Sequence, residues 1–588
     1  PGVAASISVD GNMIISGITT LGTTSFTADA TVNGVTVGKG ANSASGNTVL
    51  GETALDANTT GTLNTAIGKD SLTSNTTGIR NTALGRESLY SNSTGGNNTA
   101  IGMNAMNANT TGDYNVAVGA LALDANTTAD HNTAIGYIAL SANTTGANNS
   151  ALGTYALDVN TTGGNNTGLG YGALSENTTA SNNTAVGYKS LESNTTGTRN
   201  TAIGSGSLDA NTTADSNTSC GFNNLTSNTT GANNSAFGDN ALYANTTASN
   251  NTAVGFQAML SNTTGFNNVA VGSLTLDANT TGDKNTAVGQ GALGANTTAD
   301  NNTAVGQGAL QTATTGGSNT AVGVDALSAN TTGVLNTASG TTAMLSNTTG
   351  SRNAAFGSEA LALNTTGDYN CAFGKATLYT NTTGDNNTAY GTGALFANTT
   401  ANNNTAVGYE ALKSNTTGDK NVAVGAYALD ANTTAQGNTA IGYNTLTDCT
   451  GEANTGCGRQ AMPSMTTGIQ NSAFGYDSGG ILTTGSNNTC IGYGAGGSSS
   501  PDGGITTGSN IIILGNNSVT NFKCKVSLSV TSDQRDKTDI TDFTKGLDIV
   551  NSLRPVTYKW DNRSNYSDDL SVTPDGSKKS DTLEIGLI

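Results

Sequence analysis

The side chains best suited to metal binding or redox chemistry in this 588-residue chain are six cysteines and one histidine. Thiolates and imidazoles are the usual ligands of zinc, and cysteines also pair as disulfides. The chain has no C-x-x-C pair. Four cysteines stand at small or apolar positions of the repeat described below, so we predict that they replace core residues: Cys220, Cys371, Cys457 and Cys490. Because His131 lies at a variable position that we expect to be exposed, we predict neither a His–Cys metal site nor a cofactor.

Carboxylates are a second source of potential chemistry. Asp113, Asp283 and Asp368 each follow a Thr-Thr-Gly segment, where they could bind Ca²⁺ between repeats. We favour a solvated surface for them instead. No pair of carboxylates recurs in a groove, as a glycan-cleaving site would require, so polysaccharide hydrolysis has little support.

The C-terminal residues carry two motifs that are absent from the rest of the chain. S-D-Q-R-D-K-T-D-I begins at Ser532, and L-R-P-V-T-Y-K-W occupies 553–560. This pair resembles the S-D-x-R-x-K opening and the later L-R-P-V-x-Y-x-W stretch of the intramolecular chaperone domain of phage tail spikes and fibres (endosialidase type, peptidase S74). The resemblance covers 532–588. It implies a domain that trimerises, templates the folding of an upstream fibre and releases itself by cleavage before the motif serine.

The resemblance also implies roles for individual residues. Ser532 would be the nucleophile that attacks the bond to Thr531, and Lys537 would be its general base. This chemistry is reasonable, because a serine hydroxyl needs a nearby base and burial lowers the pKa of a lysine. Asp533 and Arg535 match the motif, and we assign them orienting or structural roles only. A Ser and a Lys five residues apart would not by themselves support catalysis.

Both ends of the chain differ from what a complete protein of this kind would have. The chain begins at Pro1 and stops at Ile588, where the family continues into further structure. We therefore expect a piece of a longer protein with a truncated chaperone domain. The chain also spans the predicted cleavage site, so it represents a precursor, a cleavage-impaired form or a sequence longer than the mature product.

A repeat of 17 residues organises the chain before these motifs. Its unit reads N-T-A-V-G-x-x-A-L-x-x-N-T-T-G-x-x, and 24 units run in register from Asn47 to Asn438. Numbered from the first Asn, position five is Gly in all 24, position nine is Leu in 21 and position twelve is Asn in 22. A register this strict predicts that each unit is one rung of a stack.

The residue types predict a role for each position of the rung. We expect the Val or Ile at position four and the Leu at position nine to point inward, with the small residues at three and eight allowing close packing. The Gly at five and the Thr-Thr-Gly segment should form turns. The Asn columns at one and twelve can form amide ladders. N-T-A-V-G predicts a short strand, and G-x-x-A-L-x-x-N predicts a second strand or one helical turn; we favour an all-β rung.

The composition limits how such a stack can be stable. Only 35% of residues are apolar, so each rung has a thin core that offsets little of its ordering entropy. We therefore predict an obligate homo-oligomer, most simply a homotrimer, with a shaft of about 115 Å. The rungs also resemble, more loosely, the N-S-V-A-I-G repeats of trimeric bacterial adhesin heads, although that period is shorter. The fold class we predict is all-β: an elongated stacked β-solenoid or β-roll with a small α+β C-terminal domain.

Four regions follow from these patterns. We predict a β-rich entry to the shaft at 1–46, a regular shaft at 47–453, irregular repeats and a distal cap at 454–531, and the partial chaperone domain at 532–588. Strands are expected at 7–9, 13–15 and 35–37. The inserted loop 498–504 could serve recognition, although we favour a role in capping alone.

Charge and hydropathy exclude several partners. The net charge of −18 argues against nucleic-acid binding, and no apolar run approaches the length of about 20 residues that membrane insertion needs. Residues 521–588 hold 10 basic and 11 acidic residues, whereas the first 520 hold only 12 and 29. The chain thus combines a sparsely charged body with a charge-rich C-terminal piece.

These features predict a structural and adhesive tail fibre protein, on the virion and outside the cell after assembly in the host cytoplasm. Its expected partners are two further copies of itself, a host-surface receptor (a glycan or a protein) and other tail or baseplate proteins. The only enzymatic event expected is a single self-cleavage at Thr531–Ser532. The alternatives are a polysaccharide-degrading tail spike, a cellular trimeric adhesin and, from the Thr-rich arrays, an ice-binding protein.

Overall fold

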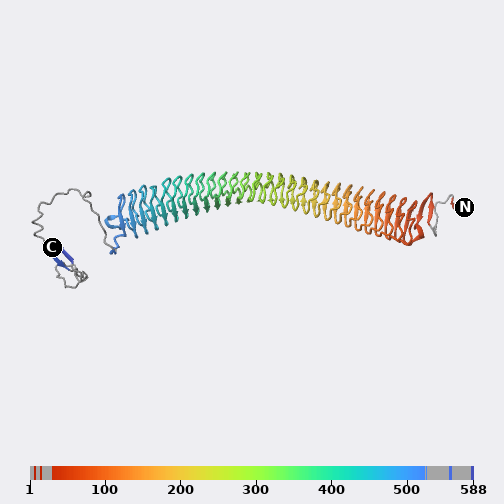
Figure 1. Cartoon of the computed structure of the whole chain (residues 1–588), viewed down its shortest axis with the longest axis horizontal. Coiled ribbons are helices and arrows are strands. Elements are labelled where there is room, and N and C mark those ends of the chain that lie inside the picture. The colour runs from red at the N-terminus through yellow and green to blue at the C-terminus, as the bar shows by residue number, and fades with distance from the viewer. Residues whose placement is uncertain are drawn as a thin grey trace, which may run out of the picture. The chain divides into compact units, whose positions relative to one another are not determined.

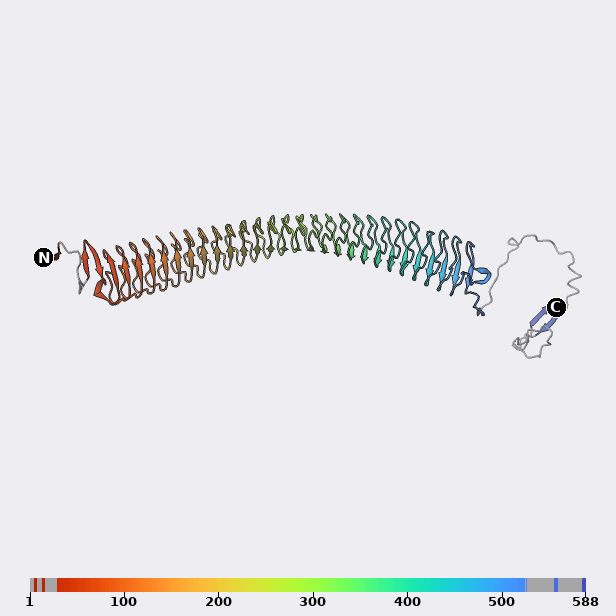
Figure 2. The ribbon, with the colours of Figure 1, turned by 180° about the vertical axis from the view of Figure 1, so that it is seen from behind.

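The structure is a computed structural model of the chain, and it describes residues 5–7, 13–15, 29–523, 525, 555–558 and 584–587. The chain divides into two units, Pro1–Val519 and Thr520–Ile588. The first unit is a long stack of similar turns, visible in Figure 1 and from behind in Figure 2. This stack is the predicted all-β solenoid of 17-residue repeats.

Short antiparallel strands precede the stack. Strands β1 (Ala5–Ile7) and β2 (Met13–Ile15) pair with each other. Strand β3 (Ala30–Val32) pairs with β4 (Val35–Gly38), which pairs in turn with β5 (Thr48–Gly51), the first strand of the stack. A 3-10 turn, η1 (Ala41–Ser43), joins β4 to β5. The predicted strands at 13–15 and 35–37 are confirmed, whereas residues 8 and 9 of the first one lie outside the described residues.

One parallel sheet runs the length of the stack. It continues from β5 through β6 (Thr65–Ile67) to β28 (Thr439–Ile441), and each of these strands from β6 on has three residues and starts 17 residues after the one before it. The stack ends with β29 (Thr455–Cys457), β30 (Ser472–Phe474), β31 (Thr489–Ile491) and β32 (Ile512–Leu514). Equivalent residues of successive rungs therefore lie beside each other.

The core is built from positions three, eight and nine, which corrects our prediction for position four. In a typical rung Ala66 and Leu72 are fully buried, whereas Ile67 is half-exposed. Successive strand residues point to opposite faces, so with Asn and Ala at positions one and three inward, position four must point outward. The interior has room only for the Leu at nine, the two Asn columns and small methyl groups. The large apolar residue at four is thus on the surface.

The remainder of each rung is neither a second strand nor a helical turn. Residues 68–74 of a typical rung form consecutive turns, in which Gly68 has φ 128°, Asp70 has φ 59° and Leu72 has φ 51°. A left-handed conformation costs an L-residue about 1–2 kcal/mol, which the burial of a leucine side chain, worth about 2 kcal/mol, roughly offsets. At position five a Cβ would meet the carbonyl oxygen of the next rung's Gly, which explains why Gly recurs there.

Two columns of buried asparagine hold the rungs in register, as predicted. At position twelve the Asn92 side-chain amide donates to Asn75 Oδ1 at 2.8 Å and to the Gly95 carbonyl at 2.9 Å. At position one the donor of the ladder is a backbone N–H instead of a side-chain amide: the Asn64 N–H donates to Asn47 Oδ1 at 2.8 Å. Buried polar groups must be hydrogen-bonded, and these amides satisfy each other from rung to rung.

The position-twelve ladder breaks where the sequence departs from Asn. Ala313 and Cys449 replace the amide in two rungs. In the rungs before them, Asn296 Oδ1 and Asn432 Oδ1 are buried without a hydrogen-bond partner. Each break therefore leaves one unsatisfied acceptor in the core.

The last rungs contain the irregular loops. The loop 498–504 includes a short 3-10 turn, η2 (Pro501–Gly503), between β31 and β32, and its Ser500 is buried with its hydroxyl donating to the Gly494 carbonyl. In the second unit, β33 (Pro555–Tyr558) pairs with β34 (Glu584–Leu587) in antiparallel fashion.

Candidate binding surfaces and the C-terminal segment

The outer face of the parallel sheet carries two columns of side chains, at positions two and four, which we call the sheet face. Position two is Ser or Thr in most rungs, and position four is apolar in 27 of the 28 strands from β5 to β32, Ser339 being the exception. Residues of the position-four column are substantially exposed, for example Leu152 at 46% and Phe237 at 41%. An apolar column of this length on the surface of one chain is unusual.

Position six, which lies just beyond the position-five glycine, carries a different surface. Exposed aromatic side chains gather in this column and at neighbouring position seven, and six consecutive rungs near the end of the stack form what we call the aromatic row. Its members are Tyr409, Tyr427, Tyr443, Arg459, Tyr476 and Tyr493.

Each member of the aromatic row contacts the next. Ring centroids are 5.4 Å apart for Tyr409 and Tyr427, and 5.4 Å apart for Tyr476 and Tyr493. The Arg459 guanidinium lies 5.9 Å from the Tyr443 ring and 5.5 Å from the Tyr476 ring, so it joins the two halves by cation–π contacts. Tyrosine and arginine are among the residue types most enriched at protein-binding interfaces. The aromatic row is therefore a candidate binding surface.

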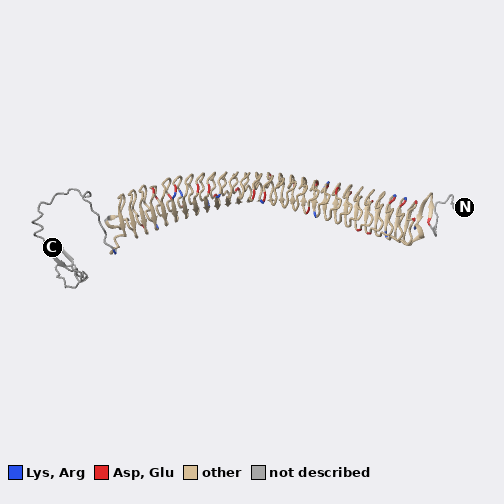
Figure 3. Cartoon of the chain, in the orientation of Figure 1, with Lys and Arg blue, Asp and Glu red and all other residues tan. Residues whose placement is uncertain are grey.

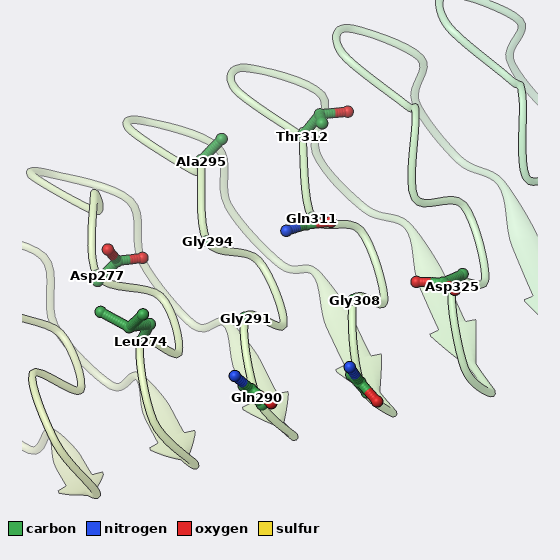
Figure 4. A pocket seen from close by; sticks show the side chains of 11 residues that line it. Leu274, Asp277, Gln290, Gly291, Gly294, Ala295, Gly308, Gln311, Thr312 and Asp325 are labelled. Carbon is green, nitrogen blue, oxygen red and sulfur yellow. The ribbon is translucent and has the colours of Figure 1, made fainter.

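A hollow of about 600 Å³ with a mixed polar and apolar lining lies on the rungs between residues 274 and 325 (Figure 4). It forms because Gly291, Gly294 and Gly308 provide no side chains to fill the surface, and Gln290 and Gln311 line it with amides. Burial raises the pKa of the Asp277 carboxyl at one end, and Asp325 lies at the other end.

The two carboxylates of this hollow are poorly placed for glycoside hydrolysis. Asp277 and Asp325 belong to rungs three steps apart, and at about 4.8 Å per step their axial separation alone is about 14 Å. A hydrolase needs its two carboxyl groups within roughly 5–9.5 Å. The hollow therefore does not supply the acid and base of a polysaccharide-degrading enzyme.

The aspartates that follow Thr-Thr-Gly have a structural role. The Asp113 carboxylate accepts the Gly96 backbone N–H at 2.6 Å, and the Asp130 carboxylate accepts that of Asp113 at 2.7 Å. In other rungs a serine hydroxyl accepts the equivalent N–H, as Ser181 does from Gly164. Within the described residues, no group of three or more His, Cys, Asp and Glu side chains could hold a metal ion.

The cysteine prediction is correct for only one of the four residues. Cys490, at position three, is buried, and burial raises the pKa of its thiol to about 11. Cys220 and Cys457 occupy position four and Cys371 occupies position two, so all three lie partly exposed on the sheet face. For Cys220 and Cys457 the error follows from the wrong orientation predicted for position four, and Cys371 lies at position two, on the same outer face.

The structure also places the histidine and a fifth cysteine. His131 is exposed as expected, and its ring stacks on Tyr114 with centroids 5.1 Å apart. Cys449 is buried in the core at position twelve, where burial raises the pKa of its thiol to about 11.

Charged side chains are spread thinly over the rungs (Figure 3). Ion pairs such as Lys69–Glu52 at 3.1 Å and Lys413–Glu410 at 3.0 Å lie at the surface, and they contribute little to stability. Among the described residues, no helix has the length and hydropathy needed to cross a bilayer.

The predicted cleavage residues cannot be placed. Ser532, Asp533, Arg535 and Lys537 lie outside the described residues, and so does Thr531. Of the two C-terminal motifs, only Pro555–Tyr558 of the second is described, as strand β33.

The fold defines a repeat protein of the β-solenoid class, and the comparisons concern its C-terminal segment. Residues 532–588 match the family described as the chaperone of endosialidase, peptidase S74. This match agrees with the resemblance drawn from the two motifs. No curated protein and no solved structure matched the chain.

Proposed function

We infer that the chain is the shaft and distal part of a homotrimeric viral tail fibre that recognises a host-cell surface. The observation that carries this inference is the joining of a long, uniform β-solenoid to a C-terminal segment that is similar to the chaperone of endosialidase. A solenoid of 28 strands is a rod of roughly 130 Å, which suits a structure that reaches from a particle to a receptor. Such a fibre belongs on the virion, assembled in the host cytoplasm and joined to other tail or baseplate proteins.

The aromatic row and the loop 498–504 are the surfaces that best suit host recognition. Both lie in the last rungs of the stack. The loop interrupts the repeat, and the row carries contacting side chains over six rungs. Exposed tyrosine rings pack against the flat faces of sugars or against protein side chains, and Arg459 adds donors for a carboxylate or hydroxyl group. We therefore propose a glycan or a surface protein as the receptor.

The C-terminal segment 532–588 would assemble the trimer and then leave it. In this proposal the Ser532 hydroxyl attacks the carbonyl carbon of Thr531 while Lys537 accepts the hydroxyl proton. The Thr531–Ser532 C–N bond then breaks, and the proton passes from Lys537 to the Ser532 nitrogen, which becomes a free amine. An ester joins the two parts until water hydrolyses it, which releases the segment. Asp533 and Arg535 would orient these groups.

Expression of the chain and of its Ser532→Ala variant tests this maturation step. We expect the unaltered chain to yield two products that separate between 531 and 532, as mass spectrometry of the termini can establish. The variant should remain one polypeptide. Identical migration of the two proteins would contradict self-cleavage, and a single-chain mass for the intact variant would contradict the trimer.

Two alternatives remain in other classes. A polysaccharide-degrading spike would release new reducing ends from host polysaccharide, and the spacing of Asp277 and Asp325 disfavours such a site in the hollow. A cellular trimeric adhesin would share the stacked architecture and differ in the membrane or particle that carries it.

A further inference from the structure

The position-four column is apolar although no part of the described chain covers it. Over the strands β5 to β32 it holds nine Val, six Ile, five Leu, four Phe, two Cys, one Tyr and a single Ser. Position six, two residues later in each rung, instead mixes charged, polar, small and aromatic residues. A surface position without a constraint varies as position six does, so a constraint acts at position four.

Strand propensity does not explain this constraint. Val and Ile favour strands, but Thr does so as well. Position two lies on the same strand and the same outer face, and there the repeat uses Ser or Thr in 22 of 28 strands. A polar β-branched residue would therefore serve at position four if solvent were its neighbour. Phe237, Phe356 and Phe474 are 36–42% exposed there. A phenyl ring makes no hydrogen bond with water, so exposure does not stabilise these side chains.

The size of the column matches a protein interface. A fully exposed aliphatic side chain presents about 100 Å², so some 27 side chains at roughly two-fifths exposure present on the order of 1,000 Å². The largest apolar patch on a monomer is usually about 300–600 Å², and a standard interface buries about 800 Å² on each partner. The sheet face thus carries enough apolar area for a stable contact.

The spacing of the column identifies the partner. The apolar groups repeat once per rung over the whole stack, in one parallel sheet that curves gently along its length (Figure 1). A partner that covers them all must present matching groups at the same interval over the same length. A second copy of this chain, parallel and in register, has both properties. Its position-four column also contains no charged residue that would repel its equivalent.

We propose that copies of this chain pack against one another through their sheet faces, with the position-four columns at the contact. This proposal rests on the homotrimeric fibre inferred above and specifies the surface that joins its chains. The stacked rings of Phe356, Phe373 and Tyr390, with centroids 4.5 and 5.6 Å apart, would form the widest part of the contact. The thin core of each chain would then be supplemented by apolar burial between chains.

Two native cysteines allow a direct test. Cys220 and Cys457 lie in the position-four column, partly exposed in the single chain. The variants Phe222→Cys and Arg459→Cys place matched thiols at position six of the same two rungs. Each thiol is labelled with a water-soluble maleimide in the intact Ser532→Ala chain. The labelling rate of each thiol in the folded protein is then divided by its labelling rate in urea. The buried Cys449 and Cys490 provide the fully protected reference.

We expect the normalised rates of Cys220 and Cys457 to be at least tenfold below those of the two position-six thiols. Light scattering on the same samples gives the mass of the assembly. Equal rates at positions four and six in a sample at three times the chain mass would overturn the proposed contact and leave the trimer intact. A sample at the mass of one chain would overturn both.

Discussion

The columns at positions four and six lie two residues apart in every rung, on either side of a glycine, and they follow opposite rules. Position four is apolar in nearly every strand, whereas position six ranges from Lys69 and Asp239 to Gln290 and Tyr443. Both columns are exposed on the single chain. The difference shows that the repeat preserves one surface for a recurring contact and leaves the other free to diversify.

The two columns therefore suit two different functions of a fibre: contact between chains at position four and receptor binding at position six. A contact between identical chains must be the same at every rung, because each rung meets its equivalent. A receptor site needs only a few rungs, so the aromatic row can occupy six of them without disturbing the stack. The following experiments test this division, beginning with the largest expected effect.

The substitution Gly255→Ala should break both columns locally, because it acts on the turn between them. Gly255 has φ 138°, and a Cβ there would meet the Gly272 carbonyl oxygen. We expect a loss of about 3 kcal/mol or more in local stability, measured as lost hydrogen-exchange protection in the flanking rungs. Gly265→Ala in the same rung is the control. A Cβ there would also meet a carbonyl oxygen, that of Gly282, but Gly265 has no left-handed φ, and Ala248 and Ala299 occur naturally at that position. Equal losses in both variants would contradict the role of position five.

Changes in the asparagine ladder should alter stability and leave both outer columns unchanged. Asn262→Ala removes donors to Asn245 Oδ1 and to the Gly265 carbonyl, and should cost about 2–3 kcal/mol. Ala313→Asn should do the reverse and add about 1 kcal/mol, because it restores a partner to Asn296 Oδ1. Thermal unfolding measures both effects, and a destabilising Ala313→Asn variant would show that the ladder is not limiting there.

Arg459→Ala should have the smallest effect on the fold and a clear one on binding. It removes two cation–π contacts at exposed rings, worth about 1 kcal/mol or less each. We expect an unchanged assembly mass and at least a tenfold loss of binding to susceptible host cells. Arg352→Ala, which removes a similar contact with Tyr369 outside the aromatic row, is the control. Equal binding by both variants would place recognition elsewhere.

The sequence predicted the stack, the register and the interior ladders, because Gly at five, Leu at nine and Asn at twelve recur without shifts. It did not predict which side of the strand faces inward. Alternation permits either Asn64 and Ala66 or Thr65 and Ile67 to point inside, and size alone favoured the isoleucine. The asparagine ladder determines the orientation, because each Asn side chain accepts the backbone N–H of the next Asn inside the stack.

Other features left no signal in the residue types. The left-handed backbone at Leu72 is unexpected, because this conformation is unfavourable for a leucine. The fold imposes it by burying the leucine side chain. The aromatic row depends on side chains 16 to 18 residues apart becoming neighbours, which follows only once the rungs are stacked. The proposed cleavage residues Ser532 and Lys537 rest on motif resemblance and on the family match.

The solution mass of two matched charge variants shows whether the sheet face joins the chains. The first variant alternates charge along position four in four successive rungs: Val254→Glu, Val271→Lys, Val288→Glu and Val305→Lys. The second places the same charges at position six of the same rungs: Phe256→Glu, Ser273→Lys, Gln290→Glu and Gln307→Lys. Alternation avoids like-charge repulsion within one chain, whereas equivalent charges would oppose each other between parallel chains in register.

Light scattering over a dilution series compares the two variants with the unaltered chain, all carrying Ser532→Ala. We expect the position-six variant to keep three times the chain mass, as the unaltered protein does. The position-four variant should dissociate at a concentration at least tenfold higher, toward the 58.4 kDa of a single chain. Identical masses for both variants at every dilution would contradict the claim that the sheet face joins the chains.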